Sequence, residues 1–344
     1  MAVLKTLARG TGKLIIGLLL LITAFYLILL AINWQDAKPN AASLHMQSLL
    51  QQPPIPAAQN GYQYYLAHNA KNELLLSGPL QELYRQCGEA QSCHDALDSQ
   101  TDLTALIAEQ HQLMTFYTEL LQYPHWQEPP PTLDTMPAYQ GLLHGQRLFL
   151  WQTWLEAKNG NIEQVNAALQ ADYQFWHTML TNSNSLITKM VSTGALKHHF
   201  QFAPEMIKQL PKAQRPAVVP AAWASAISDN ALSLELVMAG EWHYGADILA
   251  DTLQGNPAAS ENLSVVERIF DGLVRPLFLL QDTKNVHAQQ LLNQDEQPTY
   301  PWYSWLRNPS GRLLIATSVP FYSDYKQRLQ QLEPLRLQAL HQVD

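Results

Sequence analysis

The clearest structural signal in this 344-residue chain is the stretch 148–180, which reads LFLWQTWLEAKNGNIEQVNAALQADYQFWHTML. Apolar residues recur in it at steps of mostly three or four, the spacing of one face of an α-helix. The run Asn159-Gly160-Asn161 interrupts the pattern, and glycine can adopt the left-handed conformation that ends a helix. Two amphipathic helices joined by so short a turn form an antiparallel hairpin. We therefore predict helices over residues 139–158 and 162–180.

The same periodicity extends over most of the chain. It predicts further helices over residues 42–51, 74–86, 101–123, 185–209, 220–253, 263–292 and 320–341. Periodicity alone does not separate helix from strand over residues 61–66 and 312–319. We therefore expect an all-α protein whose helical hairpins pack in a repeat-like array.

An uncharged apolar run lies near the N-terminus. Residues 14–32 read LIIGLLLLITAFYLILLAI. At 1.5 Å per residue they span about 28 Å, close to the roughly 30 Å hydrocarbon core of a bilayer. The apolar region of a cleaved signal peptide is shorter, about 7–15 residues. We expect an uncleaved transmembrane signal anchor over residues 14–34, and the alternative is a long signal peptide that is cleaved near Ala41 or Ala42.

Charged residues beside this run predict its orientation. Lys5, Arg9 and Lys13 precede it with no acidic residue among them, and Trp34 follows it as an interfacial aromatic residue. Positive charge is retained on the cytoplasmic side of a membrane. We therefore expect residues 1–13 to form a cytoplasmic tail. The bulk of the chain is expected in the periplasm, held by a single pass through the inner membrane, and a lumenal eukaryotic protein is the alternative.

The composition limits the classes of partner. The chain has 21 basic and 29 acidic residues, for a formal net charge of −8, and its hydrophobic content of 47% excludes a disordered chain. Nucleic-acid binders carry a basic excess that neutralises phosphates, so we expect no nucleic-acid partner. Because an acidic domain is repelled by anionic headgroups, we expect contact with the bilayer through residues 14–34 rather than through the domain surface.

The two cysteines, Cys87 and Cys93, are the only ones in the chain. An even, closely spaced pair in an oxidising compartment predicts a disulfide. The alternatives are a metal site with His94 and a reactive redox pair. The five-residue gap is longer than the usual spacing of either, about two to four residues for a metal site and two for a redox pair.

Three consecutive prolines at 129–131 give the best internal boundary, because proline removes backbone donors and holds the chain extended. We expect an N-terminal helical region over residues 35–128, which begins with a polar tether over residues 35–40 and contains the disulfide loop. A C-terminal domain of helical hairpins is expected over residues 129–344.

Motifs of known catalytic sites are missing or misplaced. The sequence lacks the G-x-S-x-G, H-E-x-x-H, P-loop and Gly-x-Gly-x-x-Gly patterns. Ser323-Asp324-Tyr325-Lys326 and Ser228-Asp229-Asn230 match two loose patterns of serine enzymes that act on β-lactams. Their order along the chain is reversed, and the third pattern of that class, K-T-G, is absent. We therefore expect no catalytic residue and no cofactor.

The best metal candidate is the set His243, Asp247 and Asp251. Steps of four place these residues on one helical face, and an imidazole with two carboxylates is a donor set for a divalent ion. The first and third residues are about 12 Å apart along the helix, so one ion would not reach all three without strain. We favour a solvated polar stripe and expect no metal site.

Aromatic and basic residues gather late in the chain. Trp302, Trp305, Arg307 and Arg312 are of the types that dominate binding hot spots, so they form a candidate interaction surface. The alternative is a small satellite core under the last helices.

A second basic run occurs on one predicted helix, at Lys189, Lys197, His198 and His199. We favour a solvated face for this run over a site for an anionic partner.

These features favour a membrane-anchored interaction scaffold or adaptor in cell-envelope assembly, secretion or maintenance, with an envelope protein as its partner. Helical arrays offer grooves and flat faces to protein partners. One alternative is a protective, immunity-type binder whose acidic surface would suit a basic periplasmic toxin. The other is an enzyme that acts on envelope lipid or glycan.

Overall fold

The computed structural model describes residues 2–69, 74–89, 93–132, 137–254, 264–293, 302–318 and 322–343. Within these ranges every regular element is a helix, and strand pairing is limited to one isolated bridge between Asn60 and His125. The all-α prediction is therefore confirmed. Of the two ambiguous segments, 61–66 is part of α3 (Gly61–Asn69), and the described residues 312–318 of the other are part of α16 (Pro309–Ser318).

The chain forms two compact units. The anchor unit consists of residues 1–48 and 244–320, and the bundle unit consists of residues 49–243 and 321–344. The division falls inside the helix α12 (Glu235–Gln254). The three prolines at 129–131 lie inside the bundle unit, and the domain limits expected from them remain a prediction.

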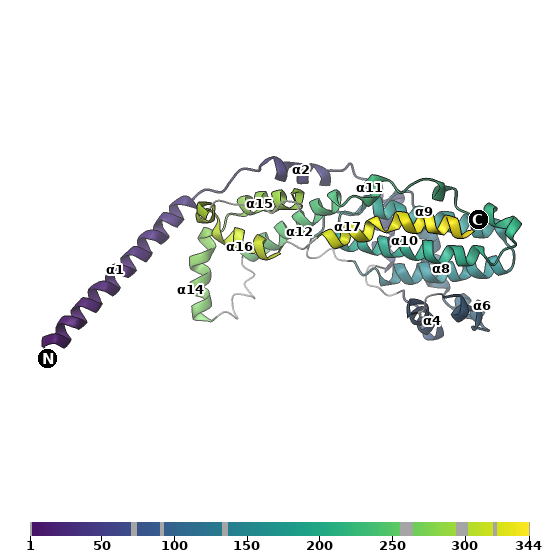
Figure 1. Ribbon diagram of the computed structural model, residues 1–344, viewed down its shortest axis with the longest axis horizontal. Coiled ribbons are helices and arrows are strands. Elements are labelled where there is room, and N and C mark those ends of the chain that lie inside the picture. The colour runs from purple at the N-terminus through teal and green to yellow at the C-terminus, as the bar shows by residue number, and fades with distance from the viewer. Residues whose placement is uncertain are drawn as a thin grey trace. The chain divides into compact units, whose positions relative to one another are not determined.

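The bundle unit is built around α8 (Gln140–Lys158), α9 (Ile162–Asn182) and α10 (Leu186–Ile207). These three helices pack against one another, α7 packs on α8, and α18 packs on α10 (Figure 1). The other described helices of the unit are α3, α4 (Gly78–Glu89), α5 (His94–Asp98), α6 (Leu103–Glu109), α7 (His111–Leu120), α11 (Asp229–Leu232), the first part of α12, α17 (Ser323–Gln330) and α18 (Leu332–Val343), with the 3-10 helices η1 (Ala57–Gln59), η2 (Lys212–Ala217) and η3 (Ala221–Ala224).

The interior of the bundle unit is aromatic. Five tryptophans are fully buried: Trp126, Trp151, Trp154, Trp176 and Trp223. Large rings bury much apolar area, so they supply a major part of the burial that drives folding.

Two glycines fit the backbone of the bundle unit to this core. Gly160 has a φ of +76°, the left-handed conformation that ends α8 before α9 begins. At Gly145 a Cβ atom would stand 2.9 Å from the ring of Tyr117, so this position lets α7 approach α8 closely.

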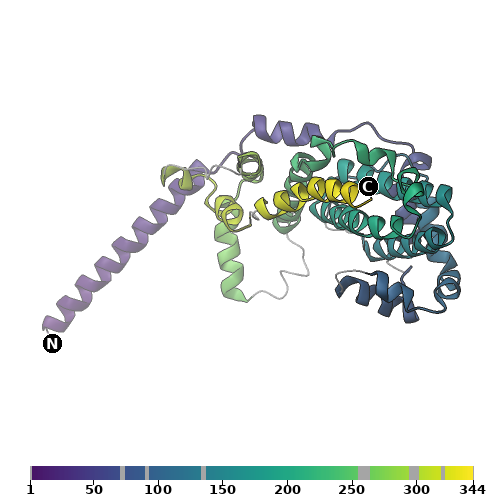
Figure 2. The ribbon, with the colours of Figure 1, turned by 45° about the vertical axis from the view of Figure 1, so that its right-hand side comes forward.

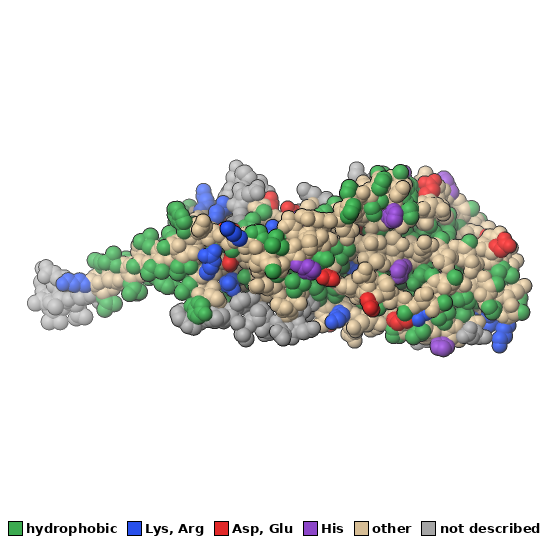
Figure 3. Space-filling model, turned by 90° about the horizontal axis from the view of Figure 1, so that it is seen from above, with side chains coloured by type: hydrophobic (Ala, Val, Ile, Leu, Met, Phe, Trp, Pro, Cys, Tyr) green, Lys and Arg blue, Asp and Glu red, His purple; other side chains and the backbone are tan. Residues whose placement is uncertain are grey.

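The anchor unit begins with α1 (Ala2–Ile32). The window Gly12–Ile32 has a mean hydropathy of 3.0 and is not buried inside the protein, and apolar side chains cover the helix surface (Figure 3). By length and composition, α1 is the one helix among the described residues that could cross a membrane. This confirms the predicted apolar helix near the N-terminus.

The remaining helices of the anchor unit are short. After α1 come α2 (Ala41–Leu50), whose last two residues belong to the bundle unit, α14 (Val265–Val274), η4 (Arg275–Leu277), α15 (Leu280–Leu292), η5 (Trp302–Leu306) and α16. The ribbon views show α14, in light green, extending from the region of the C-terminal end of α1 (Figures 1 and 2). Helices α15 and α16 pack against each other.

Four long predicted helices are divided in the structure, and two of them, over 101–123 and 320–341, become α6 with α7 and α17 with α18. The predicted helix over 263–292 becomes α14 and α15, because Pro276 lacks the N–H that a continuous helix requires. The predicted helix over 220–253 is divided into η3, α11 and α12. The hydroxyl of Ser228 accepts from the N–H of Ala231 and caps α11, and the hydroxyl of Ser233 accepts from the N–H of Glu235 where α12 begins, so each serine starts a new helix.

The polar tether after α1 lies along α15. The carboxylate of Asp36 accepts hydrogen bonds from the backbone N–H groups of Gln281 and Asp282 at 2.8 and 3.0 Å, so it caps the N-terminus of α15. Four residues later, the N–H of Asn40 donates to the side chain of Asn285 at 3.0 Å. The tether is therefore fixed to α15 by hydrogen bonds at both ends.

A second junction joins the end of α1 to the segment before α16. Arg307 donates to the backbone carbonyls of Ile32 at 3.3 Å and Gln35 at 3.0 Å. The side-chain oxygen of Asn33 accepts from the backbone N–H of Asn308 at 2.6 Å. These bonds satisfy carbonyl groups that the end of a helix leaves without partners.

Cys87 and Cys93 form a disulfide in the bundle unit. It joins the end of α4 to the start of α5, as predicted from the spacing. Residues 90–92 inside the loop lie outside the described part of the chain.

Candidate functional site

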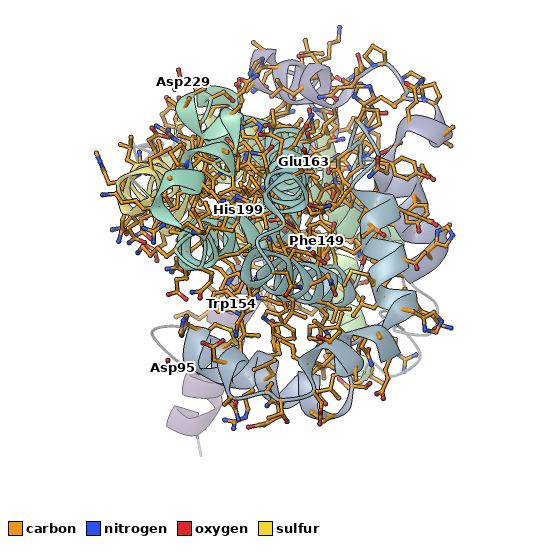
Figure 4. All side chains as sticks on the ribbon, turned by 90° about the vertical axis from the view of Figure 1, so that its right-hand side faces the viewer. Asp95, Phe149, Trp154, Glu163, His199 and Asp229 are labelled. Atoms are coloured by element: carbon orange, nitrogen blue, oxygen red, sulfur yellow. A yellow bond between two sulfur atoms is a disulfide. The ribbon has the colours of Figure 1, made fainter. Side chains whose placement is uncertain are left out.

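A carboxylate and an imidazole meet in the core of the bundle unit. Asp172 of α9 and His199 of α10 are both fully buried, and their Oδ2 and Nδ1 atoms are 2.7 Å apart. Figure 4 shows His199 among the packed helices rather than at the surface. A buried carboxylate is stable only when hydrogen bonds replace its lost hydration.

Further donors surround Asp172. The hydroxyl of Tyr117 donates to Oδ1 at 2.5 Å, and the amide of Gln146 donates to Oδ2 at 3.1 Å. The indole of Trp176 in turn donates to the Tyr117 oxygen at 2.8 Å. Burial, with the charge of Asp172 as the next cause, raises the pKa of Tyr117 well above its ordinary value, so the phenol remains a donor.

The far nitrogen of the imidazole is also occupied. The indole N–H of Trp223 donates to Nε2 of His199 at 3.2 Å, which requires Nε2 to be an acceptor and Nδ1 to carry the proton toward Asp172. In a hydrolase, that nitrogen would face a nucleophile as a general base. Here the indole of Trp223 occupies this nitrogen, so the cluster has a structural role. It joins α7, α8, α9, α10 and η3 through the side chains of Tyr117, Gln146, Asp172, Trp176, His199 and Trp223.

A second polar cluster holds the start of the proline-rich segment. Three side chains, from Trp126, Tyr139 and Thr188, donate to one carboxylate oxygen of Glu128 at 3.1, 2.9 and 2.6 Å. Burial raises the pKa of Glu128, and these hydrogen bonds oppose that shift. The cluster fixes residue 128 to the first turn of α10.

The outer side of α10 borders a groove. It has a volume of about 580 Å³ and lies between α10 and the pair α17–α18, within the bundle unit. Its lining residues are Met190, Thr193, Gly194, Lys197, Asp324, Gln327, Arg328, Gln331, Leu332 and Leu335. A Cβ atom built on Gly194 meets nothing within 4 Å, so this glycine leaves space on the groove side of α10.

The groove combines apolar and charged groups. Met190, Leu332 and Leu335 supply apolar contact, whereas Lys197 and Arg328 supply two positive charges against the one negative charge of Asp324. The charge is therefore positive on balance, in a chain whose net charge is −8. Only three of its ten lining residues have apolar side chains, so the groove is more polar than the mainly apolar cleft that usually holds a small ligand.

The predicted metal candidates lie on successive turns of α12. The Nδ1 atom of His243 is 3.2 Å from the backbone carbonyl of Pro131, which gives its ring a structural contact. Asp247 and Asp251 follow on the same helix. Over the residues that the structure describes, no group of three or more His, Cys, Asp or Glu side chains is placed to hold a metal ion.

The predicted aromatic and basic surface lies in the anchor unit. Trp302 begins η5, and its side chain lies outside the described part of the structure, whereas Trp305 is 42% exposed. Arg307 donates to the end of α1, and Nε of Arg312 donates to the carbonyl of Arg307 at 3.2 Å. Both arginines therefore contact the backbone of the same unit, and the role of this surface in binding stays a prediction.

The basic run on α10 does not form a solvated face. Lys189 and His199 are buried, and His198 is half-buried, with a pKa that burial lowers well below its ordinary value. Lys197 is exposed and lines the groove. The expectation of one solvated basic face was wrong, because the run follows successive positions around the helix.

The sequence interpretation missed the Asp172–His199 pair. The available signal was a carboxylate within the apolar stripe of α9, one position before Tyr173 and four before Trp176. Charged residues are almost never fully buried unless they are paired, so a charge on an apolar face indicates a buried partner.

Comparisons with known protein families, with curated proteins and with solved structures find no match to this chain.

Proposed function

We propose that this protein is a single-pass membrane protein of the cell envelope whose bundle unit acts as an interaction scaffold or adaptor in the periplasm. The apolar window of α1 supports the anchor. The cations Lys5, Arg9 and Lys13 before it favour a cytoplasmic N-terminus, and the Cys87–Cys93 disulfide fits an oxidising compartment.

The packing of the bundle unit supports an array of helical hairpins. Consecutive helices α7, α8, α9 and α10 pack in sequence, each on its neighbour or on the next helix but one. Such arrays present elongated grooves to partner segments. In this unit the polar groups of the Asp172 cluster pair with one another inside the core, which leaves recognition to the surface.

The observation that carries the proposal is the groove between α10 and α17–α18. Its apolar side chains suit the apolar face of a partner helix or an extended peptide. Lys197 and Arg328 suit a carboxylate on the same segment. The expected occupant is therefore an amphipathic segment of an envelope protein that carries an acidic residue.

The test is site-specific photo-cross-linking in intact cells with the full chain. Gln327, which lines the groove, is replaced by p-benzoylphenylalanine, and Gln174, which is exposed on α9, receives the same replacement as a control position. Gly194→Trp fills the groove, and Gly194→Ala is the matched small substitution. Mass spectrometry identifies the cross-linked protein.

We expect one envelope protein to be cross-linked from position 327 and not from position 174. The product should be lost in Gly194→Trp and retained in Gly194→Ala. A secreted toxin as the partner would support the protective binder in place of the scaffold. Absence of a product from position 327, or a product that Gly194→Trp leaves unchanged, would contradict the groove as the binding site.

A further inference from the structure

The helix α14 in the anchor unit has an apolar face that no other described part of the unit covers. None of its residues is buried. The exposed apolar side chains are Val265, Val266, Ile269, Phe270 and Leu273, with Val266 75% and Phe270 67% exposed. Glu267, Arg268 and Asp271 lie on the opposite face at the 100° step of a helix. A large exposed apolar patch with a polar rim marks an interaction site.

The end of α14 is bonded to the apolar part of α1. The hydroxyl of Tyr26 donates to the backbone carbonyl of Leu273 at 2.9 Å, and α1 also contacts η4. Tyr26 belongs to the apolar window Gly12–Ile32, six residues before its end. At 1.5 Å per residue this is about 9 Å inside the end of the window. The apolar face of α14 therefore adjoins the part of α1 that lies about this far inside the apolar window.

Amphipathic helices that lie in a membrane interface bury their apolar face about 5–10 Å into the boundary between headgroups and acyl chains, which matches the depth of Leu273, where Tyr26 holds the C-terminal end of α14. In both ribbon views α14 extends from its meeting point with α1 to the same side as the N-terminal part of α1 (Figures 1 and 2).

Several polar backbone groups at the two ends of α14 have partners within the protein. The carbonyl of Leu273 lies in the last turn, where carbonyls lack partners within the helix, and Tyr26 satisfies it. At the other end, Ser264 and Glu267 form a reciprocal capping box that satisfies two backbone N–H groups. Asp271 pairs with Arg275 at 3.0 Å, so two of the charges of the polar face neutralise each other.

We propose that α14 is a membrane-embedded amphipathic helix, whose apolar face occupies the acyl-chain boundary of the leaflet that surrounds the C-terminal end of α1. The occupant of this face is the lipid bilayer. Trp305 and Tyr303, 42% and 60% exposed in the same unit, are residues that favour the headgroup level. The proposal rests on the membrane anchor of the proposed function, but it is independent of the groove.

The test uses nitroxide labels on the full chain in phosphatidylcholine vesicles. Cysteine replaces Phe270 on the apolar face of α14, Arg268 on its polar face as the matched control, and Leu20 in α1 as the reference for the anchor. The native cysteines are joined in a disulfide, so labelling without reductant is specific for the new thiol. Power saturation with lipid-soluble oxygen and a water-soluble nickel chelate then measures the surroundings of each label.

We expect the label at 270 to match the label at 20, with high collision rates with oxygen and low rates with nickel, whereas the label at 268 collides with nickel. Equal nickel access at 270 and 268 would show a face in water and overturn the proposal. Low access to both reagents at 270 would show a covering protein, either a second copy or a partner, and would also overturn it. A water-exposed label at 20 would instead refute the anchor itself.

Discussion

Asp172 and His199 form a fully buried carboxylate–imidazole pair whose outer ring nitrogen accepts a hydrogen bond from the indole of Trp223. The pair has the proton arrangement of an acid–base dyad, with Nδ1–H directed at the carboxylate. The indole stands where a nucleophile or a water molecule would be needed. The pair therefore holds α9, α10 and η3 in place relative to one another.

Replacing Asp172 tests this role. Asp172→Ala leaves the donors of Tyr117, Gln146 and His199 without their shared acceptor in the core. We expect the free energy of unfolding to fall by about 3–5 kcal/mol. Urea denaturation of the detergent-solubilised chain, followed by tryptophan fluorescence, measures this change. The exposed neighbour Gln174→Ala should shift it by less than about 0.5 kcal/mol, and an equal effect of the two variants would contradict the proposed role.

Lys189 gives the bundle unit a specific pH dependence. Its Nζ donates to the carbonyl of Leu180 at 2.7 Å, and burial lowers its pKa to about 8. Because the unfolded chain binds this proton more tightly, the wild-type protein should gain stability as the pH rises from about 8 to about 10. Lys189→Met removes the free-energy cost of burying this charged amine, so we expect the variant to be more stable than the wild type at pH 7 by about 3 kcal/mol.

The measurement is urea denaturation of the wild type and Lys189→Met across this pH range. The advantage of Lys189→Met should shrink to below about 1 kcal/mol near pH 10, since the amine is then neutral in the folded wild type and only partly protonated in the unfolded chain. Lys197→Met on the exposed side of α10 is the control and should show no such trend. If the difference in the free energy of unfolding between the two proteins does not change with pH, burying the charge of Lys189 does not destabilise the fold.

Gly194 weakens α10 in exchange for space in the groove. Glycine inside a helix is less favourable than alanine by roughly 0.5–1 kcal/mol, and no atom lies within 4 Å of the Cβ that alanine would add. Gly194→Ala should therefore stabilise the bundle unit by about that amount. Thermal unfolding followed by circular dichroism measures the gain. A loss of stability would show that the groove closes over this position in solution.

The disulfide allows tests of both the stability and the proposed export of the protein. Replacing Cys87 and Cys93 together by serine should lower the free energy of unfolding by about 2 kcal/mol, because the closed loop is short. Maleimide labelling of unreduced protein from intact cells reports the native state of the pair. We expect no labelling without reductant, and free thiols in the membrane-inserted protein would count against a periplasmic location.

Sequence periodicity was enough to predict where amphipathic helices occur. The helices α8 and α9 and the apolar helix α1 depend on residues close together in sequence, so local patterns revealed them. Pro276 marks the break between α14 and α15, but the apolar periodicity on both sides of it favours one long helix.

Contacts between distant residues could not be read in this way. The Asp172–His199 pair depends on the relative rotation of α9 and α10, which sequence spacing does not determine. The cap of α15 comes from Asp36, 245 residues before Gln281. The charge of Asp172 within an apolar stripe indicated that a buried partner exists, but not which residue it is.

The two junctions at the end of α1 have a mechanical consequence. Asp36 is bonded to the first turn of α15, and Arg307 just before α16 is bonded to the carbonyl of Ile32, the last residue of α1. Transmembrane helices adjust their tilt to the local thickness of the bilayer. If α1 spans the membrane as proposed, these hydrogen bonds should make α15 and α16 turn with it when its tilt changes. A change in bilayer thickness would then be transmitted to the folded part of the anchor unit.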